Sequence, residues 1–374
     1  IPGLRRVPLL LPRLNDEVVH FESWDGQYAD SPRAIYEELL RRDAPLVYAW
    51  TADGAGARPP EPAAAVERES RAYLEQLGRS RYIVANNTLP IYFRKKRGAV
   101  YVQTWHGTPL KRIGLHESDP AYAGAAAHLR RMRRDVAKWD YLISASPVCT
   151  DIFRDAFGYR GEILETGSPR NDLLKSPDAD AVRQRVRARL GITPGTTAVL
   201  YAPTWRDDRN VAGGGFSQDR GIDAERLRND LPEATVLLTR MHRNVSRPPS
   251  FDAPGFVQDV SAYPSVSELY LAADVLVSDY SSVIYDFAVT GKPIVLFPYD
   301  LEHYERSVRG LYFEYGSWAP GPVVETSREL ARALTEVCRR PNAEPDEAYA
   351  AFVDRFCPWE DGHASTRVWE AVLA

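Results

Sequence analysis

A histidine, a glycine turn and a lysine follow an apolar stretch in residues Tyr101–Lys111, which read YVQTWHGTPLK. A strand that ends in such a turn is typical of parallel α/β sheets, whose ligands bind beyond the carboxyl ends of the strands. Because a histidine titrates near neutral pH, His106 is a candidate general base that takes a proton from an alcohol nucleophile. The alternative is a histidine that packs in the core or caps an element.

A second histidine follows the apolar stretch Thr235–Thr239, in the sequence Arg240-Met-His242. Residues two apart on an extended strand project to the same side. A cation and an imidazole on one side could bind a diphosphate and stabilise charge on a leaving phosphate. The alternative is an exposed basic strand end.

A pair of serines follows a third apolar stretch, within Asp279–Asp286, which reads DYSSVIYD. Ser281 and Ser282 fall where a helix should begin, so that hydroxyls and backbone N–H groups can converge on a phosphate. Asp286 lies one helical turn after Ser282, on the same face, where it could accept hydrogen bonds from ribose or polyol hydroxyls. The alternative is plain helix capping by serine.

Two further strand ends carry polar groups, in Tyr201–Arg206 (YAPTWR) and in Glu165–Asp172 (ETGSPRND). In the first, Thr204 and Trp205 could hold a nucleotide base or ribose, or the tryptophan could simply pack against the protein. In the second, Arg170 is a candidate phosphate clamp, and a surface arginine in a turn is the alternative.

The sequence carries no recognisable metal-binding or nucleotide-loop pattern. His-Glu-x-x-His, clustered Cys or His ligands and the Gly-rich phosphate loops are all absent. Phosphate charge would therefore be offset by Lys, Arg, His, hydroxyls and helix N-termini. We expect no metal site and no cofactor.

Composition limits the class of protein. The 374 residues suffice for two domains, and 44% hydrophobic with 26% charged residues is normal for a globular protein. A net charge of −4 argues against nucleic acid as a partner. The three cysteines, Cys149, Cys338 and Cys357, are widely spaced and fit reduced thiols in the cytosol. No apolar run approaches the roughly 20 residues that span a bilayer.

Two basic clusters, Arg94–Arg97 and Arg130–Arg134, stand out against the acidic average. The second falls in a predicted helix over residues 121–139, where a solvated face is the default interpretation. The alternative is an electrostatic track for a polyanionic acceptor or for anionic lipid headgroups.

Apolar stretches alternate with helix-like segments along most of the chain, which predicts parallel, doubly wound sheets. Strands are predicted at residues 18–21, 46–50, 82–85, 99–104, 141–144, 162–165, 198–201, 235–239, 275–278 and 293–297. Ser31 is the predicted N-cap, and Pro32 the first helical residue, of a helix over residues 31–40, and Ser176 is the predicted N-cap of a helix over residues 177–189.

The turn-rich segment Gly191–Gly195 (GITPG) marks the region where two α/β domains are predicted to join. We place one domain in residues 1–185 and the other in residues 186–374, with a cleft between them. The predicted helix over residues 365–374 can pack back on the N-terminal domain. Gly213–Gly215 predicts a mobile loop.

The motifs match a known family in their order along the chain. They comprise Phe21-Glu-Ser23, Gln27-Tyr28, Pro32–Tyr36, Gln103–Arg112, Glu165–Asp172, Tyr201–Asp207, Arg240–His242, Val266–Tyr270 and Ser278–Phe287. On these residues the chain resembles the CDP-glycerol glycerophosphotransferases, which include teichoic acid polymerases and primases and related capsule polymerases. The likeness extends over about residues 18–370.

The resemblance implies an α/β fold of the GT-B type, with two Rossmann-like domains and an interdomain cleft. It implies transfer of a polyol phosphate, glycerol phosphate above all, from a CDP-polyol to the terminal hydroxyl of a lipid-linked polyol-phosphate or glycan acceptor, with release of CMP. The N-terminal domain would face the acceptor and the C-terminal domain would bind the donor. The expected location is cytoplasmic, peripheral on the inner face of the cell membrane, with contact through the basic clusters.

The resemblance also implies roles for individual residues. His106 and His242 would be the catalytic pair, with His106 as the base and His242 stabilising the departing CMP. The implied substrate-binding residues are Gly107, Thr108, Pro109, Leu110, Lys111, Arg170, Pro203, Thr204, Trp205, Arg240, Met241, Ser281, Ser282 and Asp286. Three alternatives stay open: a CDP-ribitol-dependent transferase, a GT-B glycosyltransferase that uses a sugar nucleotide, and a non-catalytic binding module.

Overall fold

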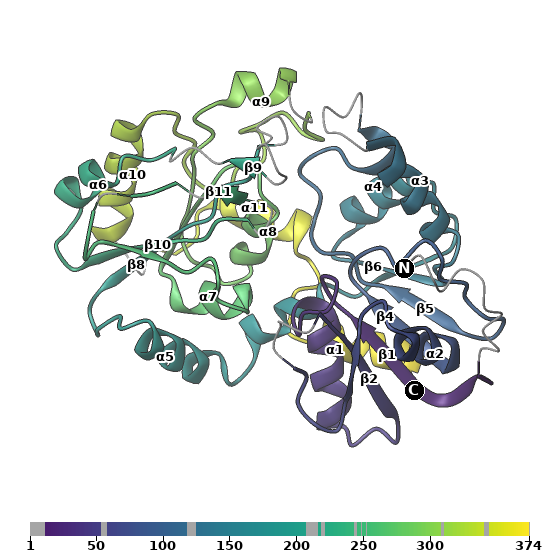
Figure 1. Ribbon diagram of the computed structural model, residues 1–374. Coiled ribbons are helices and arrows are strands. Elements are labelled where there is room, and N and C mark those ends of the chain that lie inside the picture. The colour runs from purple at the N-terminus through teal and green to yellow at the C-terminus, as the bar shows by residue number, and fades with distance from the viewer. Residues whose placement is uncertain are drawn as a thin grey trace. The chain divides into compact units, whose positions relative to one another are not determined.

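Two compact units make up the chain in the computed structural model (Figure 1). The first comprises the residues up to His106, Ala126–Asp172 and the residues from Trp359 onward, and the second comprises Gly107–Ala125 and Leu173–Pro358. The structure describes residues 12–53, 58–117, 125–206, 216–217, 221–242, 245–247, 249–251, 253–307, 310–339 and 344–373. The predicted loop at Gly213–Gly215 lies outside these ranges.

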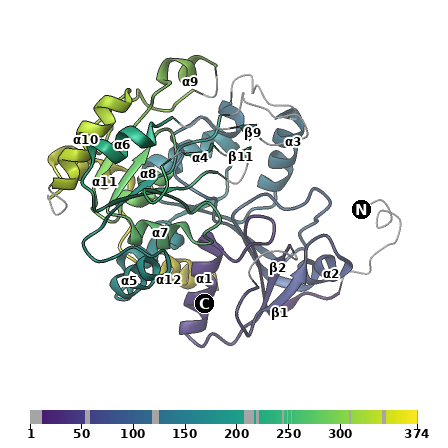
Figure 2. The same ribbon diagram turned by 60° about the vertical axis from the view of Figure 1, so that its left-hand side comes forward.

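The first unit is built on a parallel sheet with seven strands among the described residues, in the order β3-β2-β1-β4-β5-β6-β7. Figure 2 labels β1 and β2 of this sheet, with the helices α1 and α2 of the same unit. The strands are β1 (Asn15–Glu22), β2 (Val47–Ala52), β3 (Ala64–Glu67), β4 (Ser80–Ala85), β5 (Val100–Gln103), β6 (Tyr141–Ser144) and β7 (Glu162–Glu165). The helices are α1 (Asp30–Arg41), α2 (Arg71–Arg79), α3 (Ala125–Val136), α4 (Pro147–Phe157) and α12 (Ala364–Val368), with the 3₁₀ segment η3 (Pro169–Lys175), which begins in this unit, and the π-helical segment η4 (Trp369–Leu373).

The core of the first unit includes the side of the sheet that α1 covers. Ile35 and Leu39 lie one turn apart on α1, and both are fully buried. They belong to the same cluster as Phe21 of β1 and Trp50 of β2, whose rings stack with centroids 5.3 Å apart. Val368 of α12 is buried in this cluster too. The end of the chain therefore contributes to a core that begins with β1.

The second unit is built on a parallel sheet with five strands among the described residues, in the order β12-β10-β8-β13-β14. These strands are β8 (Thr197–Tyr201), β10 (Thr235–Thr239), β12 (Val257–Asp259), β13 (Val275–Ser278) and β14 (Ile294–Leu296), and a separate pair is formed by β9 (Phe216–Ser217) and β11 (Val245–Arg247). The other elements are η2 (Gly114–His116), α5 (Ala179–Arg189), α6 (Ala224–Asp230), α7 (Val266–Ala272), α8 (Val283–Ala288), α9 (Leu301–Ser307), α10 (Ser327–Arg339) and α11 (Glu347–Phe356).

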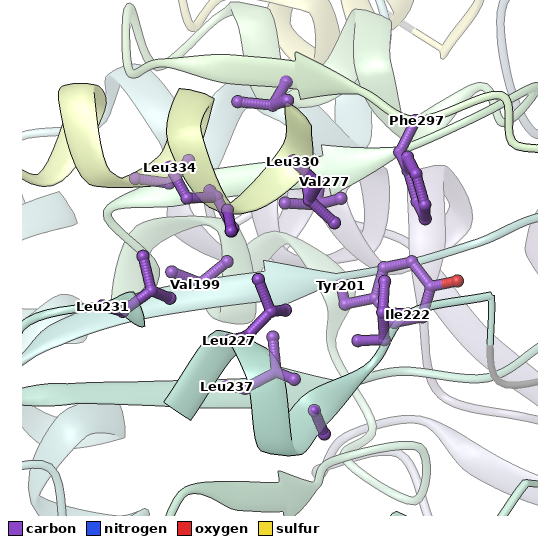
Figure 3. Packing of buried hydrophobic residues seen from close by; sticks show 14 of the residues in the cluster. Val199, Tyr201, Ile222, Leu227, Leu231, Leu237, Val277, Phe297, Leu330 and Leu334 are labelled. Atoms are coloured by element: carbon purple, nitrogen blue, oxygen red, sulfur yellow. The ribbon is translucent and has the colours of Figure 1, made fainter. Parts of the chain in front are cut away.

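Two helices cover one part of this second sheet. Figure 3 shows Leu227 of α6 and Leu330 and Leu334 of α10 against the strand residues Val199 and Val277. All five side chains are almost completely buried. Each such side chain contributes about 1.5–3 kcal/mol through removal from water. These buried contacts hold α6 and α10 against the second sheet, whose strands lead into the loops of the predicted site.

The contact-based units differ in extent from the domains placed by sequence. Residues 173–185 lie with the second unit, whereas the sequence placed them with the first. The residues from Trp359 onward lie with the first unit. The Asp172 carboxylate accepts the backbone N–H groups of Ala364, at 2.9 Å, and Ser365, at 2.8 Å, and so attaches the start of α12.

Two predicted helix caps are wrong. The N-cap of α1 is Ala29, and the Ser31 hydroxyl instead accepts the backbone N–H of Arg170 at 3.4 Å. The N-cap of α5 is Asp178, and the Ser176 hydroxyl instead donates to the Leu173 carbonyl at 3.0 Å. Serine hydroxyls have several nearby backbone partners to choose from, so a helix cap is only one outcome.

Among the described helices, none combines the length and the apolar character of a bilayer-spanning segment. The helix predicted over residues 121–139 is α3, and residues 121–124 lie outside the described ranges.

Candidate functional site

The predicted site residues divide between the two units. His106 and Arg170 belong to the first unit, and the others belong to the second. The chain passes from the first unit to the second between His106 and Gly107.

His106 follows the carboxyl end of β5, as predicted. Its Nδ1 lies 2.8 Å from the backbone carbonyl of Asn86, which follows the neighbouring strand β4. Because a carbonyl only accepts hydrogen bonds, Nδ1 carries the proton in the neutral ring, and the lone pair is on Nε2. This is the tautomer that a general base acting through Nε2 requires.

Two indole rings hold the imidazole of His106 from different parts of the chain. The Trp105 ring stacks on it with centroids 4.2 Å apart, and the Trp24 ring, which follows β1, lies at 4.8 Å. The backbone N–H of Trp24 donates to Asn86 Oδ1 at 3.0 Å. Asn86 therefore contacts both His106, through its backbone carbonyl, and the Trp24 loop, through its side chain. The ring therefore has little freedom to rotate.

The loops around His106 carry backbone strain. Trp24, Asp25 and Trp105 have φ angles of 46°, 64° and 53°, in the left-handed region that residues with a Cβ rarely adopt. Such residues cost about 1–3 kcal/mol each and cluster at functional sites. Gly26, next in the chain, has φ 129°, and a Cβ there would lie 2.5 Å from the backbone nitrogen of Asp53. The Trp24 loop thus has a tightly prescribed shape.

Arg170 lies in η3 and its side chain is 7% exposed. Its Nη1 is 3.4 Å from Asp30 Oδ2, and the same oxygen accepts the Trp24 indole N–H at 3.0 Å. The predicted role of Arg170 as a phosphate clamp stays a prediction.

The segment after His106 is anchored within the second unit. Thr108, Pro109 and Leu110 are buried, and Lys111 forms an antiparallel bridge with Leu311. The Leu110 carbonyl accepts the backbone N–H of Tyr312 at 3.0 Å. Gly107 has φ 150°, which favours glycine at the turn. The end of the Gly-Thr-Pro-Leu-Lys motif is therefore held by backbone pairing to Leu311 and Tyr312. The Tyr312 hydroxyl also accepts the backbone N–H of Ile113, 199 positions away, at 3.3 Å.

Three predicted motifs of the second unit follow adjacent strands of one parallel sheet. Pro203–Trp205 follows β8, Arg240–His242 follows β10, and Ser281 with Ser282 follows β13, and these strands are neighbours in the order β10-β8-β13. The carboxyl ends of these strands therefore lie at one edge of the sheet, where α/β proteins bind ligands.

Asp279 joins two of these loops. Its Oδ1 accepts the backbone N–H of Thr204 at 2.7 Å and that of Tyr280 at 2.6 Å. The Thr204 hydroxyl is buried and has no hydrogen-bond partner among the described residues. A buried hydroxyl without a partner is costly, which marks Thr204 Oγ1 as a group that a ligand could satisfy.

A buried arginine that the sequence reasoning missed supports these loops. Arg206 is fully buried and pairs with Asp279 at 3.0 Å and Asp300 at 2.7 Å. Its guanidinium also lies 5.0 Å from the Tyr280 ring centroid and 5.2 Å from that of Tyr304. Burial alone would lower the pKa of Arg206, but the Asp279 and Asp300 carboxylates raise it above its ordinary value. In the sequence, Arg206 is the last residue of the Tyr201–Arg206 motif, and Asp279 is the first residue of the Asp279–Asp286 motif. These opposite charges in two strand-end motifs were the available signal for the ion pair.

His242 is exposed, and its ring lies 5.8 Å from that of Trp205. The Arg240 side chain, unlike that of His242, is directed to the protein: its Nη1 donates to the backbone carbonyls of Val260, at 3.2 Å, and Tyr263, at 2.8 Å. Burial lowers the pKa of Arg240. Strand β10 ends at Thr239, so the strict alternation that the sequence argument assumed does not extend to this motif.

The Met241 side chain is buried, and its backbone N–H donates to the Ser261 hydroxyl at 2.9 Å. This bond fixes the backbone between Arg240 and His242.

The paired serines begin α8. Ser282 is the N-cap residue, yet its hydroxyl caps no backbone N–H, which removes the plain capping interpretation for that side chain. Ser281 Oγ accepts the N–H of Val283 at 3.4 Å. Asp286, one turn into α8, is 4% exposed.

Within the described ranges, no cluster of three or more His, Cys, Asp or Glu side chains could hold a metal ion. The expectation of no cofactor stays a prediction.

Comparison with known proteins gives close relatives. Residues 4–374 match the model of the family described as CDP-Glycerol:Poly(glycerophosphate) glycerophosphotransferase. A teichoic acid glycerol-phosphate transferase of Staphylococcus aureus is 38% identical over 373 residues, which cover 97% of this chain and 95% of the relative. A teichoic acid poly(glycerol phosphate) polymerase of Bacillus subtilis is 35% identical over 96% of this chain, and the chain spans 48% of that longer protein.

A solved structure of the wall teichoic acid polymerase TagF matches with a TM-score of 0.86 and 34% identity, over 96% of this chain and 89% of the other. This match confirms the predicted α/β fold of the GT-B type.

Proposed function

The chain belongs to the CDP-glycerol:poly(glycerophosphate) glycerophosphotransferase family, and on this premise we propose that it transfers glycerol phosphate from CDP-glycerol to the terminal hydroxyl of a lipid-linked teichoic acid acceptor. The observation that carries the proposal is the held tautomer of His106, whose Nδ1 faces the Asn86 carbonyl at 2.8 Å. The relatives at 35–38% identity, named for glycerol phosphate, support glycerol as the polyol.

In the proposed reaction the acceptor hydroxyl gives its proton to Nε2 of His106. The hydroxyl oxygen forms a bond to the β-phosphorus of CDP-glycerol, and the bond from that phosphorus to the CMP oxygen breaks. Phosphoryl transfer of this kind depends mainly on positioning and on stabilisation of charge. A general base contributes about 10²–10⁴-fold to such a rate.

The second unit would hold the donor and receive the departing charge. Ser281 and Ser282 lie at the start of α8, where hydroxyls and backbone N–H groups suit a diphosphate. The buried hydroxyl of Thr204 can bond the donor as well. His242, beside Trp205, would stabilise or protonate the departing CMP. Arg170 is left out of this assignment because its guanidinium is already paired with Asp30.

The acceptor and the membrane surface are anionic, and α3 offers a matching charge. Arg130, Arg131, Arg133 and Arg134 are exposed, while Met132 is buried. We propose that this face contacts anionic lipid headgroups, which attract each surface Lys or Arg by about 1 kcal/mol. Sedimentation with phosphatidylglycerol vesicles tests this: charge reversal at Arg130 and Arg134 should release the protein, and unchanged binding would contradict the proposal.

A CMP-release assay tests the transfer reaction. The purified chain would be given CDP-glycerol, CDP-ribitol or UDP-N-acetylglucosamine, each with a synthetic lipid-linked acceptor, and product would be followed by mass spectrometry. We expect CMP and an acceptor that is heavier by glycerol phosphate with CDP-glycerol alone. Transfer from CDP-ribitol would change the polyol, UDP release would indicate a glycosyltransferase, and donor binding without any transfer would indicate a binding module.

A further inference from the structure

A continuous set of contacts connects Arg170 to His106 within the first unit. Arg170 Nη1 lies 3.4 Å from Asp30 Oδ2. The indole N–H of Trp24 donates to the same oxygen at 3.0 Å. The Trp24 ring in turn lies 4.8 Å from the His106 ring, at an interplanar angle of 51°. A buried cation, a carboxylate, an indole and an imidazole therefore follow one another in contact.

The shape of the Trp24 loop is prescribed by its backbone as well as by these contacts. Trp24 and Asp30 both adopt left-handed backbone conformations, with φ angles of 46° and 61°. Conformations of this kind persist only where surrounding interactions impose them. The Asp30 side chain supplies two such interactions, because Oδ1 accepts the Ser31 N–H at 2.7 Å and Oδ2 accepts the Trp24 indole.

Charge explains why Arg170 belongs to this set. The Asp30 side chain is 9% exposed and the Arg170 side chain 7% exposed, so each offsets part of the cost of burying the other, and loss of one would leave a buried charge without its partner. Without Arg170, the Asp30 carboxylate would lose its buried cation and could turn toward water. The acceptor that fixes the indole of Trp24 would then move.

We propose that Arg170, Asp30 and Trp24 form a positioning relay that orients the imidazole of His106, and that Arg170 acts through this relay and not as a phosphate clamp. The proposal rests on the proposed function, because it concerns the ring that takes the proton. The Trp24 indole fixes the rotation of the imidazole, Asp30 fixes the indole, and Arg170 fixes the direction of the Asp30 carboxylate.

The two roles of Arg170 predict different kinetics. A phosphate clamp contacts the donor, so its loss raises the KM for CDP-glycerol. A relay residue contacts no substrate, so its loss lowers kcat and leaves that KM unchanged. Misplacement of a reacting group by about 1 Å can cost on the order of 100-fold in rate.

A double-mutant cycle separates these possibilities. Trp24→Phe keeps an aromatic ring and removes the indole N–H, Arg170→Gln removes the buried cation, and the third variant combines both. Steady-state kinetics would be measured with CDP-glycerol and the synthetic acceptor, with melting temperatures as a check on folding. Arg42→Gln is the matched control, since it removes an ion pair to Glu38 on the same helix α1 without touching Trp24.

We expect about 10- to 100-fold lower kcat for each single variant, donor KM within about twofold of the parent, and a double variant no worse than the poorer single. Arg42→Gln should keep the parental kcat. A raised donor KM for Arg170→Gln with an unaffected Trp24→Phe, or effects that multiply in the double variant, would overturn the relay.

A measurement without turnover keeps the test independent of the proposed function. In ¹⁵N-histidine spectra, with the His106 signals assigned through His106→Gln, the parent should show a single tautomer with the proton on Nδ1. Trp24→Phe and Arg170→Gln should both shift these signals toward a mixture of tautomers. If the parent releases no CMP from any donor, the proposed function fails, while unchanged ¹⁵N signals in both variants would sink the relay alone.

Discussion

The predicted site residues of the first unit and those of the second unit are held in different ways. Around His106, the contacts described above are a backbone carbonyl from Asn86 and two indole rings, all of them neutral groups. Around Thr204, the support is ionic, because Arg206 is buried between two aspartates and stacked on tyrosines. The first arrangement fixes one ring, and the second fixes the backbone of several loops.

This difference matches the roles proposed for the two groups of residues. A base needs one orientation and one tautomer, which neutral contacts can impose without adding a charge beside the ring. A diphosphate is large and multiply charged, so the groups that bind it must come from several strand ends held at constant separation. A buried ion pair with ideal partners is rigid, and its loss leaves charges that the interior cannot solvate.

The largest expected effect is on catalysis in the first unit. His106→Ala should lower the rate of CMP release by at least about 10²–10⁴-fold while the melting temperature stays near that of the parent. The exposed His303→Ala in α9 is the control and should have parental activity. Near-normal turnover of His106→Ala would remove the general base from the mechanism.

The second effect is on stability in the second unit. Arg206→Leu leaves Asp279 and Asp300 without their cation and should lower the free energy of unfolding by about 3–5 kcal/mol, measured by urea denaturation. Arg226→Leu removes the more exposed pair with Asp230 in the same unit, and it should cost no more than about 1 kcal/mol. Equal losses of unfolding free energy in the two variants would show that the buried Arg206 ion pairs stabilise the protein no more than an exposed pair does.

A smaller effect tests ligand contact directly. Thr204→Val removes the buried hydroxyl at nearly constant volume and should raise the KM for CDP-glycerol about 10- to 100-fold, the loss of one hydrogen bond to a charged group, with no loss of stability. Thr235→Val is a matched control, because its hydroxyl is also buried without a described partner but lies at the amino end of β10. Its KM should not change, and a parental KM for Thr204→Val would exclude a donor contact.

The smallest expected effect is on the free energy of unfolding, and it concerns the start of α12 in the first unit. Asp172→Ala removes the acceptor for two N–H groups at the start of α12 and should destabilise the protein by about 0.5–2 kcal/mol. Asp178→Ala is the comparison, since Asp178 is the N-cap of α5 but makes no side-chain capping bond. A loss for Asp178→Ala that matches the loss for Asp172→Ala would contradict the capping role of Asp172.

The positions of the motifs were predictable because each follows an apolar stretch. The predicted strands at residues 141–144 and 162–165 coincide with β6 and β7. In a parallel sheet every strand ends at the same edge, so motifs after successive strands gather there without any knowledge of side-chain contacts. The collinear motifs also gave the family, which the match over residues 4–374 confirms.

The supporting residues were not predictable in the same way. Asp30 and Arg170 are 140 positions apart, and nothing in either local sequence pairs them. The burial of Arg206 depends on Asp300, 94 positions later. The strand β3 was missed because its residues, Ala64–Glu67, are mostly exposed and show no alternation. Local patterns reveal which loops carry polar groups, whereas the groups behind those loops emerge only from the tertiary structure.

The return of α12 to the first unit has a consequence for synthesis on the ribosome. A domain at the start of a chain usually folds as soon as it emerges. Here Val368 belongs to the same core cluster as Val19, so the core of this unit is complete only after residues translated hundreds of codons later have emerged. A nonsense codon shortly before residue 359 would therefore remove core residues from a unit whose strands had all been translated already.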